Sequence, residues 1–214
     1  MQKLYVWGGA AVLGAMVLGT LAATLLQRGP DLFADCRGTV VAGGQIGGPF
    51  TLLDGDGKTV TDTEILAKPA LVYFGYTSCS DVCPLDNARN AQASDDLLHD
   101  NSRDRLENGY DVTPVFISLD PARDTPEVMK EYASYISPRM VGLTGSAAQV
   151  KAAANAYKVY FNIPSPSDPN YSVDHTTLTY LMLPGRGFMD VFDRSLSVED
   201  VVKHTACYLD KAKS

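Results

Sequence analysis

Short apolar runs alternate with amphipathic or Ala-rich stretches through most of the chain. Three runs have the length and composition of buried β-strands, at 69–74, 115–119 and 140–143. A helix is predicted after each run, from about 84 to 98, from 125 onward and from 146 to 157. Strands that alternate with helices in this way indicate an α/β domain.

Two helix starts carry clear capping signals. Thr125 is a good N-cap, and Pro126 follows it at the first helical position, where the missing N–H of proline is tolerated. Ser197 and Asp200 have the spacing of a capping box, which predicts a final helix near the C-terminus.

Two hairpins complete the pattern. Residues 50–53 and 59–61 flank the turn 54–57, in which Asp-Gly supplies positive φ angles, and residues 178–183 and 188–192 flank a Pro-Gly turn. The first turn is acidic but lacks the ligand ladder and closing Glu of a calcium loop. The order of all these elements predicts a thioredoxin-like fold with an N-terminal β-hairpin extension and a helical insertion between the second and third core strands.

The first 28 residues differ in character, because no charged side chain occurs from Leu4 to Gln27. A membrane-spanning helix needs about 20 apolar residues. We therefore expect a transmembrane anchor at 1–28, a lead-in linker at 29–45 and the folded domain at 46–214. A cleaved signal peptide is the alternative, although the run exceeds the about 7–15 residues of a signal h-region. Lys3 favours a cytoplasmic N-terminus, which places the domain in the periplasm on a single-pass inner-membrane anchor.

Composition narrows the function classes. Charged residues make up 20% of the chain and the formal net charge is -7, with no Lys/Arg cluster. Because phosphate binding needs a basic patch, nucleic acid is not an expected partner. The four cysteines are Cys36, Cys79, Cys83 and Cys207, and an oxidising compartment would allow disulfides among them.

Cys79 and Cys83 stand where a buried strand ends and a helix begins. Positions i and i+4 share a helix face, and a helix N-terminus favours negative charge, so we expect both thiol pKa values to fall. Thioredoxin-type oxidoreductases use C-x-x-C, and the extra residue here lets the sulfurs separate around a metal. Copper(I) prefers soft thiolates and also accepts imidazole.

A third ligand is therefore expected, and the chain offers three histidines. His99 and His204 lie in polar surroundings and are expected to be solvated. His175 instead precedes the apolar strand 178–183, in the loop where a thioredoxin carries its cis-proline beside the cysteines. An imidazole there can approach the thiolate pair.

Three ordered blocks of the sequence resemble the Sco/SenC family. They are Phe74-Gly75-Tyr76-Thr77-x-Cys79-x-Asp81-x-Cys83-Pro84, then Phe116-Ile117-Ser118-Leu119-Asp120-Pro121-x-Arg123-Asp124-Thr125-Pro126, then Tyr171-x-Val173-Asp174-His175-Thr176. The resemblance covers about residues 45 to 210. It implies a thioredoxin-like copper protein that assembles the binuclear CuA centre of cytochrome c oxidase subunit II, with that subunit and other copper chaperones as partners.

The resemblance also implies roles for individual residues. Cys79 and Cys83 become thiolate ligands and a redox pair, and His175 becomes the third ligand of a site for Cu(I) and Cu(II). Four neighbours are candidates for tuning the ligands, fixing a nearby loop or contacting the partner: Asp81, Asp174, Asp120 and Arg123.

Cys36 and Cys207 have no counterpart in the three blocks. On the last helix, Cys207 points about opposite Val198, which begins the apolar stripe. An exposed thiol in an oxidising compartment tends to be paired, so we expect a Cys36–Cys207 disulfide between the lead-in and the last helix.

Other functions fit parts of this pattern. A thiol-disulfide oxidoreductase that reduces the CuA-site cysteines, or acts in redox signalling, needs the dithiol but not His175. A peroxidase needs a strongly activated single thiol in a Pro/Thr-type pocket, which the sequence does not offer. Structural zinc normally takes four ligands, and the sequence offers three.

Overall fold

The computed structural model describes residues 32–37, 45–99, 109–164, 168 and 170–213. The chain divides into two units, 1–35 and 36–214, and the fold described below belongs to the second. The expected anchor at 1–28 and most of the expected lead-in at 29–45 lie outside the described residues. In the described part of the chain, no helix has both the length and the apolar character that crossing a membrane requires.

A mixed β-sheet forms the centre of the domain, and the described residues give it seven strands in the order β2-β1-β5-β4-β3-β8-β9. Neighbours β3, β4 and β5 pair in parallel, and the other neighbours pair antiparallel. The strands are β1 (Thr51–Asp54), β2 (Thr59–Thr61), β3 (Ala70–Gly75), β4 (Thr113–Ser118), β5 (Val141–Thr144), β8 (Thr179–Leu183) and β9 (Gly187–Phe192).

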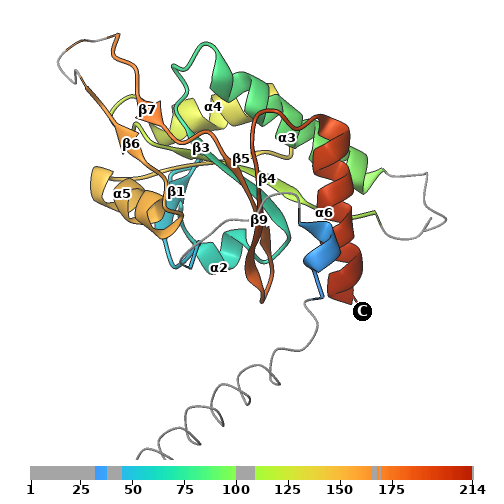
Figure 1. Ribbon diagram of the computed structural model, residues 1–214. Helices are drawn as coiled ribbons and strands as arrows, with labels where there is room; N and C mark the ends of the chain where they lie inside the picture. Colours follow the sequence, from blue (N-terminus) through green and yellow to red (C-terminus); the bar gives the residue numbers. More distant parts are fainter. Residues whose placement is uncertain (1–31, 38–44, 100–108, 165–167, 169, 214) are drawn as a thin grey trace, which may run out of the picture. The chain divides into compact units, whose positions relative to one another are not determined.

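The helices cover both faces of this sheet. They are α2 (Asp62–Ile65), α3 (Val82–Leu98), α4 (Pro126–Ile136), α5 (Ala147–Ala156) and α6 (Val198–Lys213), with a 3₁₀ turn, η1, at Ala34–Cys36. Because β3, β4 and β5 follow one another across the sheet through right-handed crossovers, α3 and α4 lie on the same face. Helix α6 packs beside α3, and α5 lies on the opposite face (Figure 1). This is the thioredoxin-like architecture with an N-terminal hairpin that the sequence predicts.

Both predicted helix starts are confirmed. The Thr125 side chain accepts a hydrogen bond from the Val128 N–H, and Pro126 opens α4. The hydroxyl of Ser197 accepts from the Asp200 N–H at 3.1 Å, while the Asp200 carboxylate accepts from the Ser197 N–H. Helix α3 begins two residues earlier than predicted, so Cys83 lies inside the helix rather than before it.

The buried face of α3 is unusually polar. Its buried side chains include Asp86, Asn87, Asn90 and Ser94. Buried polar groups need hydrogen-bond partners, and Asn90 donates to the Thr179 hydroxyl at 2.9 Å. The helix is therefore fixed against the sheet by directional contacts as well as by apolar packing.

Helix α2 and the strands β6 (Phe161–Asn162) and β7 (Asp174–His175) were not anticipated from the sequence. Thr61 and Glu64 form a capping box that starts the short helix α2. Strands β6 and β7 form a separate antiparallel ribbon. This ribbon places His175 in a strand, which holds its backbone more firmly than a loop would.

A disulfide joins Cys36 to Cys207, with a Cα–Cα distance of 5.5 Å across a sequence separation of 171. This is the pairing that the sequence led us to expect, and such bonds stabilise domains by about 2–4 kcal/mol. His99 is exposed as expected. The expectation for His204 was wrong, because its Nδ1 lies 3.0 Å from the Cys36 carbonyl oxygen and its ring is half-buried. The disulfide brings this carbonyl to the helix, a contact that polar sequence surroundings do not indicate.

Candidate metal and redox site

The two remaining cysteines meet at the carboxyl end of β3 and the start of α3. Cys79 lies in the connecting loop, Cys83 lies in the first turn of α3, and both are free thiols. The backbone N–H of Cys83 donates to the Sγ of Cys79 at 3.4 Å. The Cys79 sulfur therefore occupies the place of an N-cap acceptor, where it satisfies a helix N–H that would otherwise lack an intrahelical partner.

The two thiols have different acidities. Burial pushes the pKa of Cys79 upward, but hydrogen bonds from the backbone around Cys83 and Asp81 outweigh it and leave the pKa below the ordinary thiol value. Burial raises the pKa of Cys83 well above its ordinary value. The expectation that both pKa values fall was therefore wrong for Cys83, because its sulfur is fully buried behind the helix start.

Close packing holds the Cys83 sulfur in place. A Cβ atom on Gly75 would lie 2.7 Å from the Cys83 Sγ, so only glycine leaves room for the sulfur there. The hydroxyl of the fully buried Tyr73 lies 4.0 Å from the same sulfur. The end of β3 thus shapes the sulfur position as much as the helix does.

His175 faces this sulfur from the other side, with its Nε2 3.6 Å from the Cys83 Sγ. Its Nδ1 lies 2.9 Å from the Thr176 carbonyl oxygen, which can only accept a hydrogen bond, so we assign the ring proton to Nδ1. Burial lowers the pKa of His175. The ring is therefore neutral near pH 7 and presents the lone pair of Nε2 to the sulfur.

Two tyrosine rings pack edge-on against this imidazole. The Tyr76 ring meets it edge-on at a centroid distance of 5.9 Å, and the Tyr73 ring does so at 6.3 Å. Both tyrosines are buried. The ring of His175 is therefore positioned by packing before any metal binds.

Arg123 links the loop before His175 to the loop after β4. Its Nε donates to the fully buried Asp120 carboxylate, and its Nη1 donates to the Tyr171 carbonyl oxygen at 2.9 Å. The guanidinium lies 3.7 Å from the Tyr171 ring centroid and 5.7 Å from that of Tyr76. The Tyr171 hydroxyl donates to Asp120 at 2.6 Å, which closes the network.

Asp124 ties the same loop to the cysteine loop. Its carboxylate accepts hydrogen bonds from the Thr77 N–H at 3.1 Å and from the Ser118 hydroxyl at 2.6 Å. Burial raises the pKa of Asp124, and these hydrogen bonds oppose that rise. Three loops that are distant in sequence are therefore joined around the thiols and the imidazole.

The other two predicted neighbours lie at the surface. Asp81 is the exposed N-cap of α3, and its side chain makes no capping hydrogen bond. Asp174 is exposed in β7, opposite Asn162. Asp174 directly precedes His175, and Asp81 lies two residues from each cysteine, so both exposed carboxylates are close in sequence to predicted ligands.

Two thiols and a neutral imidazole form a donor set that suits copper. Among the described residues, no three His, Cys, Asp or Glu side chains already stand together as a metal-binding group. Binding through all three residues therefore requires the side chains to draw together, from a starting separation of 3.6 Å between the Cys83 sulfur and His175. The pair of free thiols can also form a disulfide by losing two electrons and two protons.

Sequence reasoning gave no role to Tyr73, Gly75 or Asp86. Asp86 is buried three residues beyond Cys83, near Arg89 and Arg194, and burial raises its pKa. A polar residue at helical spacing from a reactive cysteine is a usable sequence signal for Asp86. The contact of Gly75 with the sulfur depends on strand and helix meeting in space, and no local pattern reveals it.

The fold and the site define a thioredoxin-like protein with a dithiol–imidazole cluster at the carboxyl end of its parallel strands. The SCO1/SenC family model matches residues 40–210, so the chain belongs to this family. SenC of Rhodobacter capsulatus is 51% identical over 197 residues, which cover 91% of this chain and 86% of SenC.

Two further relatives come from Arabidopsis thaliana. The mitochondrial SCO1 homolog 1 is 40% identical over 156 residues, and the match spans 73% of this chain but only 45% of that longer protein. A crystal structure of ScoI with copper bound has a TM-score of 0.67 at 36% identity and covers 78% of this chain and 98% of that one.

Proposed function

We propose that this protein binds copper through Cys79, Cys83 and His175 and delivers it for assembly of the CuA centre of cytochrome c oxidase subunit II. The observation that carries the proposal is the 3.6 Å approach of the His175 Nε2 to the Cys83 sulfur, beside a second free thiol. Membership of the SCO1/SenC family and the copper-bound ScoI relative support it.

The site explains how both copper oxidation states could be held. Two thiolates satisfy Cu(I), which prefers soft sulfur ligands, and the added imidazole suits Cu(II). Because His175 is neutral near pH 7, no proton has to leave its Nε2 before it binds a metal. Both cysteines must lose a proton, and Cys79 does so more readily because its pKa is lowered.

The surrounding residues have supporting roles in this proposal. Asp120 and Arg123 hold the loop that leads to His175, through their contacts with Tyr171. Asp81 and Asp174, which are exposed beside the ligands, are available to the copper-receiving protein.

We further propose that residues 1–28 anchor the protein in the inner membrane, with the domain in the periplasm. The absence of charged side chains from Leu4 to Gln27 supports the anchor. The Cys36–Cys207 disulfide supports the compartment, because such bonds persist in oxidising environments.

Copper titration of the reduced protein, followed by absorption and electron paramagnetic resonance, tests the metal site. The His175→Ala variant should lose Cu(II) affinity by more than the roughly 10–100-fold that removal of an outer-shell partner causes. His99→Ala is the matched control, since His99 is exposed and belongs to no described site. Equal Cu(II) affinity in both variants would remove the chemical basis of the proposal.

A second function, reduction of the CuA-site cysteines, is favoured by the unequal thiols. Cys79, 9% exposed and with a lowered pKa, suits attack on a disulfide, and the fully buried Cys83, with a raised pKa, suits its resolution. Copper-free reduced protein should then open a disulfide in the subunit II domain. His175→Ala should retain this activity, and Cys79→Ser should lose it.

A further inference from the structure

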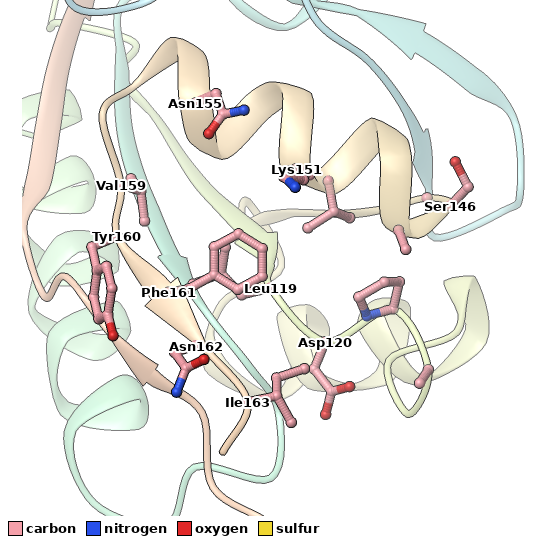
Figure 2. Close-up of a pocket in the computed structure, with 15 residues that line it drawn as sticks. Leu119, Asp120, Ser146, Lys151, Asn155, Val159, Tyr160, Phe161, Asn162 and Ile163 are labelled. Atoms are coloured by element: carbon pink, nitrogen blue, oxygen red, sulfur yellow. The ribbon is translucent and has the colours of Figure 1, made fainter. Parts of the chain in front are cut away.

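A groove lined in part by strand β6, whose partner strand carries His175, contains none of the three predicted ligands (Figure 2). Its volume is about 750 Å³ and it is open to solvent. The lining comes from α5, from the segment around β6 and from the loop after β4: Leu119, Asp120, Pro121, Ala122, Gly145, Ser146, Ala147, Val150, Lys151, Asn155, Val159, Tyr160, Phe161, Asn162 and Ile163.

The two long walls of the groove match in length. Along α5 the lining runs from Ser146 to Asn155, which at a rise of about 1.5 Å per residue is roughly 13 Å. The facing wall, 159–163, contains strand β6 and can span up to roughly 13 Å at about 3.3 Å per residue. A trough of this length accommodates about four residues of an extended peptide.

The lining is mainly apolar. Figure 2 shows the Phe161 ring pointing into the space between the walls, with Val159 and Ile163 on the same wall. On the opposite wall, Ala147 of α5 adds exposed apolar surface, while Val150 of the same helix is buried. Such a lining favours apolar side chains of an occupant, because burial of apolar surface drives association.

The charge that the groove presents to an occupant is positive. The charged lining residues are Asp120 and Lys151. The Asp120 carboxylate already binds Arg123 and the Tyr171 hydroxyl, whereas Lys151 is exposed on the α5 wall. An occupant that carries a carboxylate is therefore complementary to the groove.

The β6–β7 ribbon connects the groove to the proposed metal site. Phe161 lies directly opposite His175 in the β6–β7 ribbon, so the two side chains share one face of the ribbon. The next pair is joined by hydrogen bonds from the Thr176 N–H to the Tyr160 carbonyl at 2.9 Å and from the Tyr160 N–H to the Thr176 hydroxyl at 3.1 Å. An occupant packed on Phe161 thus lies one strand away from the imidazole.

We infer that this groove docks an extended, mainly apolar segment with one carboxylate, supplied by the protein that receives copper. The inference rests on the proposed function, because it takes the copper acceptor as the partner. Docking beside β6 places the partner against the strand that pairs with the His175 strand. The partner's position is then coupled to the ligand before copper moves.

The test measures binding of the copper-loaded protein to the soluble domain of subunit II of the same organism's oxidase. Ala147→Trp fills the groove, and Ala148→Trp is its matched control, because Ala148 is equally exposed on the same helix turn but does not line the groove. We expect the first variant to weaken binding by roughly tenfold or more, as loss of a well-packed interface contact does, and the control to bind like wild type.

Lys151→Glu is a second test of the groove, and it does not require a large side chain to fit into it. It should also weaken binding and slow copper transfer, whereas Lys58→Glu, in the exposed β1–β2 turn, should change neither. Copper affinity should be unchanged in all four variants, since none touches a ligand. Circular dichroism spectra and unfolding midpoints establish that each variant is folded.

The outcomes separate the two proposals. If wild type binds and transfers copper but Ala147→Trp and Lys151→Glu do so equally well, the groove inference is wrong and the copper-delivery function stands. If wild-type protein with full copper occupancy neither binds subunit II nor transfers copper to it, the proposed function fails and the groove inference fails with it.

Discussion

Arg123 offers a sharp test of how the imidazole is positioned. Replacement by Ala removes the ion pair with Asp120, the hydrogen bond to the Tyr171 carbonyl and the packing on the Tyr171 ring, at 3.7 Å, in one step. The Asp120 carboxylate remains fully buried and keeps only the Tyr171 hydroxyl as a side-chain partner among the described contacts. The substitution therefore leaves the buried negative charge of Asp120 without its ion-pair partner.

The magnitude follows from burial. Breaking a fully buried ion pair costs about 3–5 kcal/mol, because the remaining charge is left uncompensated. The Arg123 side chain is 23% exposed, so water can partly replace it, and we take the lower end of that range. The lost cation–π contact adds about 0.5–1 kcal/mol. We expect Arg123→Ala to lower the free energy of unfolding by about 3.5–4 kcal/mol.

Arg123→Lys separates charge from shape. Lysine keeps the positive charge but lacks the planar fork that donates to Asp120 and Tyr171 while stacking on a ring. We expect a smaller loss of about 1–2 kcal/mol. Because the same contacts hold the loop before His175, both variants should weaken Cu(II) binding more than Cu(I) binding, which the two thiolates can sustain.

Urea unfolding measures these changes, with circular dichroism as the signal. The protein is copper-free, the Cys79 and Cys83 thiols are reduced, and the Cys36–Cys207 bond is intact. The Asp120→Asn/Arg123→Ala double variant completes the cycle. Its loss should be smaller than the sum of the single losses, because without the Asp120 charge the arginine has less to neutralise. A loss below about 0.5 kcal/mol for Arg123→Ala, or strict additivity in the cycle, would refute this account of the network.

Two further predictions concern the sulfurs. Gly75→Ala places a methyl group 2.7 Å from the Cys83 Sγ, so we expect a loss of about 1–3 kcal/mol in stability and weaker copper binding. Gly48→Ala, whose Cβ would meet its nearest neighbour at 3.5 Å, should change neither, and thermal unfolding with competitive copper titration checks both. In the reduced copper-free protein, iodoacetamide should alkylate Cys79 before Cys83, with a rate that rises with pH around a midpoint below the ordinary thiol pKa, because only the thiolate reacts. Peptide mass spectrometry identifies the modified residue, and preferential labelling of Cys83 would contradict the assigned acidities.

Apolar runs and turn chemistry determined most of the fold. The strand at 69–74 needed only its apolar composition, and the start of α4 needed only Thr125 followed by Pro126, because these are local preferences. The position of α3 was predicted to within two residues of its start, although its buried face carries Asp86, Asn87 and Asn90 and so lacks a clear apolar stripe.

The sequence by itself determined which residues carry the chemistry, because thiol and imidazole side chains at a strand-to-helix junction and a later strand edge are few in number. Only the tertiary structure decided their properties. The opposite pKa shifts of Cys79 and Cys83 arise from burial and from hydrogen bonds that exist only when the loop and helix are folded. The separation between His175 and Cys83, 92 residues apart in sequence, is likewise set by the pairing of β7 with β6 and by the Arg123 network. Local sequence fixes the identity of a side chain and its helix or strand preference, whereas its solvation and neighbours depend on chain segments that meet only in the folded domain.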